Sequence, residues 1–342
     1  MNQASYAIAL ATMLAAQCGA NPTPVAAPTI LTSIDARGID TSFASLAVDS
    51  SGGVWIADAP DYAVHRIDIA SGKRSDYPLP QNAEVHGAVI GDDGALWLAD
   101  YSNSELLRYD VAGSMKSFPV GHGVFPLGLV YAVGKFWFVE HLTGAIGTMT
   151  PDGTVTTIPV PIPSGLGGQL AHDDDGTLWI GSRSASGKVG RRDVDGSFHL
   201  ADVGGQLGQL YPCPDGGVAY TSGSGLGYEA NPWIQHIGLF DARGRSVHAD
   251  YLPPPSAPKQ TQKIHSDEVA GPLPPPGIVY FACTSDGAWF VIDRKLVGHI
   301  DHEGRARYFP VAALSHAPAD ASPILTRTAW VAVGDRVDEL SY

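Results

Sequence analysis

Two short segments of the sequence combine acidic residues with histidine in patterns suited to proton transfer. In NAEVHGAVI, Glu84 and His86 are one residue apart, so on a β-strand both side chains would lie on the same face. Asp100 follows fourteen residues after His86, and in FVEHLTG, Glu140 directly precedes His141. A histidine beside a carboxylate can act as a base near neutral pH, and crowded carboxylates favour a bound cation. These residues are therefore candidates for a functional site.

The alternative is that each candidate is only the polar end of a strand, and a repeat in the sequence bears on this choice. Similar phrases, SSGGVWIAD, DDGALWLAD, AVGKFWFVE and DDDGTLWIG, place tryptophan at positions 55, 97, 137 and 179, at intervals of 42, 40 and 42. The phrase recurs as PDGGVAYTSG, with Ala219 in the tryptophan position, and then around Trp289 and Trp330. A period near 41 is typical of a propeller in which each repeat forms one four-stranded blade.

The repeat predicts an all-β fold, a seven-bladed β-propeller of four-stranded blades. Forty glycines and 26 prolines spread among short apolar runs agree with many strands and turns. The last repeat has only three strands, so we expect an N-terminal strand near residues 29–36 to complete the last blade. The propeller domain is then residues 29–342, and the one irregular interval is explained by a proline-rich loop at residues 253–276.

Composition and the N-terminus indicate where the protein acts. A formal net charge of -14 and the lack of a basic cluster argue against nucleic acid as a partner. Residues 1–17 have the length of a signal-peptide core, and residues 1–28 are interpreted as an export segment with a tether, although no Lys or Arg precedes the apolar run. We expect an exported protein, either a periplasmic or cell-surface lipoprotein anchored through Cys18 or a secreted one. A disordered N-terminus is the alternative, and the membrane is expected as a partner only through the lipid anchor.

The two remaining cysteines, Cys213 and Cys283, lie six residues before the tryptophan positions of their own repeats. They should therefore occupy equivalent places on neighbouring innermost strands, which can be too far apart for a bridge. Buried free thiols are the expectation, and a disulfide is the alternative.

Polar residues three positions after each tryptophan should gather at one mouth of the central channel. They are Asp58, Asp100, Glu140 and Ser182. Each ends the second strand of a blade, on the face where the innermost strands begin, and such mouths bind ligands in propellers. The predicted ligand-binding residues are Asp58, Glu140, His141, Tyr228 and His265, the last two from long loops where they could also be solvated loop residues. His172 and Asp173 to Asp175 belong to a turn on the opposite face.

The third repeat, with WF-x-E-(x5)-IG, a PDG turn and the ending TIPVP, resembles the virginiamycin B (streptogramin) lyase family over residues 29–342. The resemblance implies a seven-bladed propeller that uses a divalent metal, usually Mg²⁺. It also implies a linearising elimination on a cyclic depsipeptide, in which a histidine base removes the proton α to the ester carbonyl and the ester oxygen leaves.

Carried over residue by residue, the resemblance makes His86, Glu84 and Asp100 the catalytic set, with Glu84 and Asp100 as metal ligands. The match is incomplete, because the family has glutamate where this chain has Asp100. The family also has a second strand-start histidine, whereas the other starts here carry Ala44, Leu127, Gly168 and Gly208. We therefore expect a lyase-like propeller that binds a small molecule, a metal or a protein at its mouth. The alternatives are an active Mg²⁺-dependent carbon–oxygen lyase and a gluconolactonase-like hydrolase, a class that usually has six blades.

Overall fold

The computed structural model describes most of the chain between Thr29 and Ser341. The described residues are 29–39, 45–58, 62–160, 166–173, 175–182, 187–203, 206–213, 216–224, 233–250, 278–284, 287–292, 296–310, 328–333 and 336–341. The predicted export segment, residues 1–28, and the predicted loop at residues 253–276 lie outside them. No helix within the described part is long and apolar enough to cross a membrane.

The described residues form seven antiparallel sheets, six with four strands and one with three. The first two sheets, from the innermost strand outwards, are β2 Ser45–Val48, β3 Gly53–Asp58, β4 Ala63–Asp68 and β5 Arg74–Pro78, then β6 Val85–Ile90, β7 Leu96–Asp100, β8 Glu105–Tyr109 and β9 Met115–Pro119. The next two are β10 Pro126–Ala132, β11 Lys135–Glu140, β12 Ile146–Met149 and β13 Val155–Ile158, then β14 Leu166–His172, β15 Leu178–Ser182, β16 Lys188–Arg192 and β17 Phe198–Asp202.

The fifth and sixth sheets continue the same order along the chain. They are β18 Gln206–Pro212, β19 Gly217–Ser224, β20 Trp233–Asp241 and β21 Ser246–Asp250, then β22 Ile278–Thr284, β23 Gly287–Ile292, β24 Leu296–Asp301 and β25 Ala306–Pro310. The three-stranded sheet contains β26 Thr328–Val333, β27 Arg336–Ser341 and, at its outer edge, β1 Thr29–Asp35. We call these sheets blades one to seven in this order.

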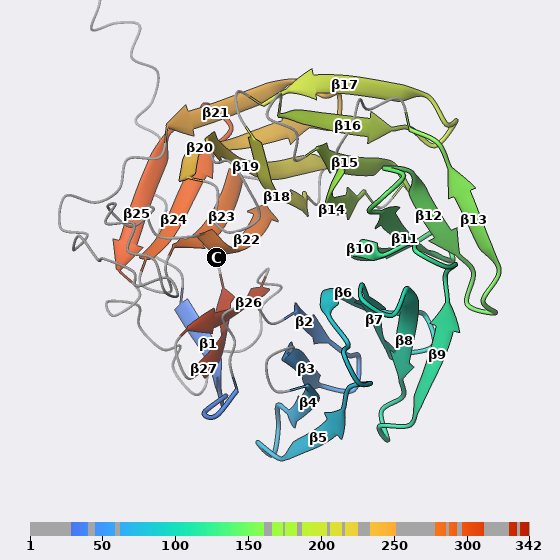
Figure 1. Ribbon diagram of the computed structural model, residues 1–342. Coiled ribbons are helices and arrows are strands. Elements are labelled where there is room, and N and C mark those ends of the chain that lie inside the picture. Colours follow the sequence, from blue (N-terminus) through green and yellow to red (C-terminus); the bar gives the residue numbers. More distant parts are fainter. Residues whose placement is uncertain are drawn as a thin grey trace, which may run out of the picture.

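The blades stand around a common axis, with β2, β6, β10, β14, β18 and β22 innermost and β5, β9, β13, β17, β21 and β25 at the rim (Figure 1). Each innermost strand contacts that of the next blade, from β2 and β6 through to β18 and β22. The predicted all-β propeller is confirmed. The predicted closure is confirmed as well, since Thr29 pairs with Ser341 and Asp35 with Arg336 in antiparallel register. The position expected for the innermost strand of blade seven falls in residues 311–327, outside the described residues.

The hydrophobic core lies between neighbouring blades. Trp55 and Val64 of blade one pack with Leu96, Leu98 and Leu107 of blade two, and all five are buried. Burial decreases towards the rim: β7 is buried along its whole length, whereas in β9 only Phe118 is buried. The outermost strands β5, β9 and β25 end in proline, as expected for strands with a free edge.

Glycine in the third strand of a blade makes room for the large side chain that follows the tryptophan position. Gly147 pairs with Phe138 and Gly238 with Tyr220. A Cβ atom at Gly147 would lie 2.0 Å from the Phe138 ring, and one at Gly238 would lie 2.2 Å from the Tyr220 ring. The glycine of the repeated IG phrase is therefore an architectural requirement of the blade.

We call the face where innermost strands begin the mouth face, and the face that carries the hairpin turns of each blade the turn face. One turn recurs on the turn face: a glycine with positive φ follows three residues after the first turn residue, as at Gly52 and Gly176. This is a type I turn closed by a bulge, which matches the DG signals in the sequence. The first turn residue often accepts a hydrogen bond from the blade's tryptophan, as Asp49 Oδ2 does from Trp55 Nε1 at 2.7 Å.

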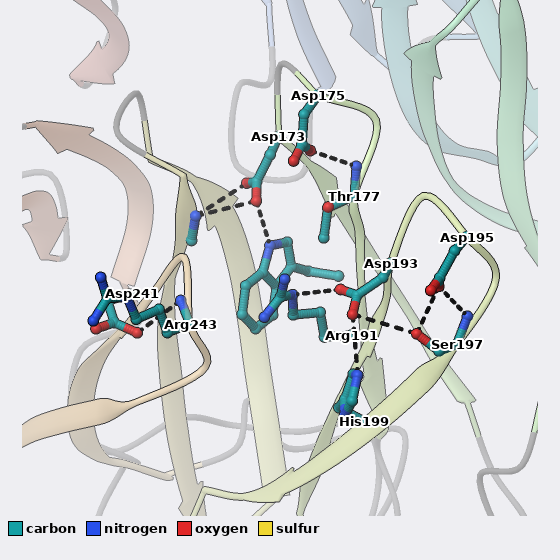
Figure 2. A network of polar contacts seen from close by, with 12 residues as sticks. Asp173, Asp175, Thr177, Arg191, Asp193, Asp195, Ser197, His199, Asp241 and Arg243 are labelled. Atoms are coloured by element: carbon teal, nitrogen blue, oxygen red, sulfur yellow. Dashed lines mark hydrogen bonds and ion pairs between the residues drawn. The ribbon is translucent and has the colours of Figure 1, made fainter.

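Asp173 uses such a turn to connect blades four and five (Figure 2). Its carboxylate accepts hydrogen bonds from Trp179 Nε1 at 3.2 Å and from the backbone N–H of Gly217 in the next blade, also at 3.2 Å. Asp173 was expected to belong to turn chemistry, and its contacts agree. Burial raises the pKa of this carboxyl. At Asp49 burial also works to raise the pKa, but hydrogen bonds from Arg66, Ser51, Gly53 and Trp55 outweigh it and lower the pKa.

The expectation of free thiols is wrong, because Cys213 and Cys283 form a disulfide with their Cα atoms 4.7 Å apart. Cys213 follows β18 and Cys283 lies near the end of β22, so both are near the turn-face ends of adjacent innermost strands. Innermost strands converge on the axis, so equivalent positions on neighbouring blades come within bridging distance. The bond fastens blade five to blade six.

Replacing both cysteines with serine should lower the free energy of unfolding by about 2–4 kcal/mol, because the disulfide closes a loop of 70 residues in the unfolded chain. Urea unfolding of the wild type and the double variant, without reductant, measures the loss. Excess reductant should bring the wild type to the stability of the variant and leave the variant unchanged. Equal stabilities without reductant would contradict the cross-link.

Asp49 and Asp173 should respond to acid in opposite senses. The folded pKa of Asp49 is lowered, so its stabilising effect is present above the unfolded pKa of about 3.9 and is lost as the pH falls below it. The folded pKa of Asp173 is raised, so its ionised form opposes folding above that pH and the penalty disappears on acidification.

Asp49→Asn should therefore cost about 1–3 kcal/mol at pH 7 and less at pH 3. Asp173→Asn should cost more at pH 3.5 than at pH 7. Urea unfolding of both variants across this range provides the measurement, and parallel stability profiles for the two variants would contradict the assignment.

Candidate functional site

The predicted pair Glu84 and His86 is formed at the mouth face of blade two. His86 is the second residue of β6, and its Nε2 lies 3.0 Å from Oε1 of Glu84. Ser102 Oγ donates to the other carboxylate oxygen, Oε2, at 3.0 Å. The two side chains remain accessible, with 39% of His86 and 52% of Glu84 exposed. They are thus oriented by contacts within the blade and open to a ligand.

The environment of Glu84 keeps its carboxyl ionised. Partial burial works to raise the pKa, but the hydrogen bonds from His86 and Ser102 and the charge of His86 lower it below the usual range. A carboxylate that hydrogen-bonds to an imidazole fixes the orientation of the ring. The pair therefore suits either recognition of a polar ligand or acceptance of a proton.

Asp100 is buried within blade two, where it binds the backbone of Glu84, and it does not line the mouth. It ends β7, is fully buried, and accepts hydrogen bonds from the backbone N–H of Glu84 at 3.2 Å and from Asn103 Nδ2 at 2.8 Å. The backbone N–H of Asn103 donates as well, at 3.3 Å. We expected this side chain to border a solvent-filled opening, and its burial corrects that expectation. The physical reason is that the chain leaves the sheet here, and the carboxylate binds the donors of the departing loop.

Glu140 is a second correction of the same kind. It ends β11 and is only 4% exposed, with Thr143 Oγ1 donating to Oε2 at 2.8 Å and Thr157 Oγ1 to Oε1 at 2.6 Å. The first donor comes from the loop after β11 and the second from β13. Glu140 thus connects the end of β11 to the loop that follows it and to β13. Its role is structural, as in the alternative that each candidate is only the polar end of a strand.

An aromatic cluster connects blades two and three at the mouth face, and its centre, Tyr101, is not among the residues predicted from the sequence. The Tyr101 ring meets His86 edge-on at 5.1 Å between centroids and His141 edge-on at 5.5 Å. Phe125, which precedes β10, lies 5.1 Å from the same ring. His86 and His141 are therefore brought to one site through a tyrosine. We call His86, Tyr101, Phe125 and His141 the mouth cluster.

The sequence contains a signal for Tyr101, one position after the predicted residue Asp100 in the repeat. Tyr101 and His141 both stand four residues after the tryptophan of their blades, Trp97 and Trp137. The predicted residues Asp100 and Glu140 stand at the third position, where the side chains are buried in the blade. Because side chains alternate along an extended chain, the fourth position presents the other side.

The other predicted ligand-binding residues are Asp58, Tyr228 and His265. Asp58 ends β3, as its place in the repeat predicts. Tyr228 and His265 lie outside the described residues, and so does Ala44. The strand register assigns the positions equivalent to His86 in blades three, five and six to Leu127, Gly208 and Val279. In blade four the register is irregular between Leu166 and Leu170, so the position falls on Gly168, as expected, when counted from the partner of Trp179 and on Gly167 when counted from the partner of Ser182. None of these positions carries a histidine.

The described residues do not fit a divalent-metal centre at this site. No group of three or more His, Cys, Asp and Glu side chains among them could hold a metal ion. Of the two predicted ligands, Asp100 is buried and its carboxylate is directed at three N–H donors. Of the two, only Glu84 faces solvent, and its two carboxylate oxygens already contact His86 and Ser102, so the predicted ligand pair does not present two free carboxylates to a metal.

The fold and site define a β-propeller whose mouth carries a histidine–glutamate pair and an aromatic cluster. Residues 31–208, more than half of the chain, match the virginiamycin B lyase family. The chain belongs to this family. The third-repeat pattern on which the resemblance was based lies within the matched part, and so does the E-x-H-G start of β6, Glu84 to Gly87.

Solved structures agree at the level of the fold. A streptogramin B lyase is similar with a TM-score of 0.66 and 16% identity, over 92% of this chain and 98% of that one. A catalytically inactive variant of virginiamycin B lyase from Staphylococcus aureus with quinupristin gives 0.63 and 18%, over 91% and 98%. A chain of the mitotic checkpoint complex gives 0.64 and 15%, over 95% and 96%, so similarity at this level does not specify an activity. No curated protein matches the sequence.

Removing His86 should shift the titration of Glu84. In the His86→Ala variant the pKa of Glu84 should rise towards its ordinary value of about 4.3, because the largest of the pKa-lowering interactions is lost. Carboxyl ¹³C chemical shifts followed through a pH titration report the change. Ser102→Ala should produce a smaller rise in the same direction, and an unchanged pKa in both variants would show that the pair is not formed in solution.

Proposed function

We propose that this protein binds a small molecule at the mouth face, in the space bordered by the mouth cluster and Glu84, and that it does so without the full residue set of a lyase. The observation that supports this function is the contact of His86 and His141, from two adjacent blades, with the ring of Tyr101. The cluster offers aromatic surface and imidazole nitrogens, and Glu84 offers an exposed acceptor beside it. Small-molecule sites combine these features: apolar surface with a few oriented polar groups.

A lyase reaction is the second candidate, and one observation favours it. Glu84 holds the imidazole of His86 at hydrogen-bond distance, as a general base requires. His86 would take a proton from the carbon next to the one that bears the ester oxygen of a cyclic depsipeptide, the electron pair would form a carbon–carbon double bond between these two carbons, and the ester oxygen would leave with its acyl group as a carboxylate. The family resemblance implies Mg²⁺, which would supply polarisation of a substrate carbonyl. The described residues here supply neither a second histidine at an equivalent strand start nor a metal-ligand set, and for this reason binding ranks first.

Incubation with quinupristin separates the candidates. Elimination converts a ring into an open chain without changing the mass, so the product is recognised by a shift in chromatographic retention. Hydrolysis, as expected of a gluconolactonase-like enzyme, adds the mass of one water. We expect quinupristin to bind by calorimetry and to stay cyclic, with or without excess Mg²⁺. An open product of unchanged mass would establish the lyase instead.

The mouth cluster should determine this binding. Tyr101→Leu and His86→Ala should each weaken affinity for quinupristin by about tenfold, because each removes a contact surface worth about 1.4 kcal/mol. His199→Ala is the matched control, since His199 is also exposed and also pairs with a carboxylate, Asp193, but lies in blade four. Affinity that falls equally in all three variants, or in none, would contradict binding at the mouth cluster.

We also propose that the protein is exported, as the N-terminal segment predicts. The disulfide between Cys213 and Cys283 supports this, because disulfides persist in oxidising compartments and are rare in the cytosol. Cell fractionation tests the location, and incorporation of a labelled fatty acid, lost in Cys18→Ser, tests lipidation. Recovery of the full-length chain in the cytosol with both cysteines reduced would contradict export.

A further inference from the structure

The mouth cluster borders a carboxylate that is both ionised and exposed. Partial burial works to raise the pKa of Glu84, but the hydrogen bonds from His86 and Ser102 outweigh it and lower the pKa, so the carboxylate is charged at neutral pH. The side chain is 52% exposed. The backbone carbonyl of Glu84 accepts the N–H of Tyr101 at 2.8 Å, which brings the residue next to the aromatic rings. A negative charge and aromatic surface therefore face solvent side by side.

The strand ends and loops that border the mouth cluster are acidic in sequence. Residues 79–86, 100–105, 119–127 and 140–146 of blades two and three contain no Lys or Arg, and they carry the four carboxyl groups of Glu84, Asp100, Glu105 and Glu140. Burial raises the pKa of Glu105, and the charge of Asp100 raises it further. In a chain with a net charge of -14, the potential around Glu84 therefore attracts cations and repels anions.

The rings of the mouth cluster supply the second property that an organic cation needs. The ring centroid of Tyr101 lies 5.1 Å from that of His86, 5.1 Å from that of Phe125 and 5.5 Å from that of His141. None of these four residues is buried. The face of a tyrosine or phenylalanine ring is electron-rich and attracts a positive group within about 6 Å of its centroid. A neutral apolar ligand would use the rings and leave the charge of Glu84 without a partner.

The backbone fixes Phe125 between the two blades. Its φ is 49°, in the left-handed region that is unfavourable for a bulky side chain. Its N–H donates to Ser104 Oγ of blade two at 3.3 Å, and its carbonyl accepts the N–H of His141 of blade three at 3.3 Å. Backbone conformations of this kind persist where the surrounding structure enforces them, and they cluster at ligand sites. An aromatic surface fixed in this way loses little conformational entropy when a ligand binds.

The contacts that Glu84 already makes favour one kind of cation. His86 Nε2 and Ser102 Oγ each lie 3.0 Å from one of its two carboxylate oxygens. A metal ion would have to replace these contacts with bonds to the oxygens, and the rings beside them offer no further oxygen ligands. A quaternary ammonium group donates no hydrogen bond, so it can lie against the carboxylate while both contacts remain. Its methyl groups can at the same time pack on the ring of Tyr101.

We propose that the ligand of the mouth site is an organic cation that carries a quaternary ammonium group. The ammonium group lies between the Glu84 carboxylate and the Tyr101 ring, and the rest of the ligand lies against Phe125 and His141. The carboxylate supplies attraction of opposite charges, and the rings supply cation–π and apolar contact. This inference rests on the function proposed above, because it names the class of small molecule that binds at the mouth.

Choline and 3,3-dimethylbutan-1-ol are the probes, because they have the same shape and differ in the positive charge. Titration of choline into ¹⁵N-labelled full-length protein should shift the amide resonances of Glu84, Tyr101, Phe125 and His141, and leave that of Cys213 in place. Choline should bind about fivefold or more tightly than the alcohol.

Two substitutions separate the charge from the rings. Glu84→Gln should reduce the affinity for choline to that for the alcohol and leave the alcohol unaffected. Glu303→Gln is the matched control and should change neither affinity, since it removes the same charge from another exposed, paired glutamate in the outer turn of blade six. Tyr101→Leu keeps apolar surface but loses the ring, so it should weaken choline more than the alcohol. Circular dichroism checks that each variant is folded.

Equal affinity for choline and the alcohol, or choline affinity that persists in Glu84→Gln, would overturn the inference. So would an absence of choline-induced shifts in the wild type. Quinupristin tells this failure apart from failure of the proposed function. If quinupristin shifts the amide resonances of the mouth cluster and choline does not, small-molecule binding at the mouth stands and the preference for a cation is wrong. If none of the three compounds shifts them, both proposals are wrong.

Discussion

The pairing of β1 with β27 is the contact on which the rest of the ring depends. It joins residues 29–35 to residues 336–341, the two ends of the described chain, so the last blade is shared between the start and the end of the sequence. Each blade buries its core against the next, and an open ring would expose one such surface at each end. The mouth cluster lies between blades two and three, so it requires that neighbouring blades keep fixed positions around the axis.

Contacts between blades are strengthened differently around the ring. Blades four and five share the carboxylate of Asp173, and blades five and six share a disulfide. In blade three Ala132 stands at the position of Asp49 and Asp173, and its carbonyl accepts the hydrogen bond from the Trp137 indole at 3.1 Å. The Arg192 guanidinium from blade four lies 5.7 Å from the same ring. The turn residue at this position of the repeat thus accepts the tryptophan N–H in each case, through a carboxylate in blades one and four and through a backbone carbonyl in blade three. For this reason the turn phrases of the sequence differ although the tryptophan period is kept.

Much of the fold could be predicted because its signals are local and repeated. The tryptophan period predicted the blades, and the DG signals predicted the turns. The missing fourth strand of the last repeat predicted the closure by Thr29–Asp35. The disulfide was missed because the distance between Cys213 and Cys283 depends on how two blades converge, which no local pattern encodes. The pair Glu84 and His86 lies within one strand start and was predictable. Tyr101 was not, since its contacts come from two blades.

The start of β6 shows why a family motif can persist when a reaction does not. Gly87, directly after His86, packs so closely on blade three that a Cβ atom there would lie 2.7 Å from the backbone nitrogen of Leu129. The glycine of E-x-H-G is therefore required by the packing of neighbouring innermost strands, whatever the histidine does. His86 itself is exposed and is not part of the core, so leucine, glycine or valine can occupy its position in other blades without disturbing the ring. The packing of the innermost strands therefore requires the glycine but does not require the histidine. His86 has a partner in Glu84 and a ring contact in Tyr101, which also reaches blade three, and the proposed recognition at this strand start rests on these contacts.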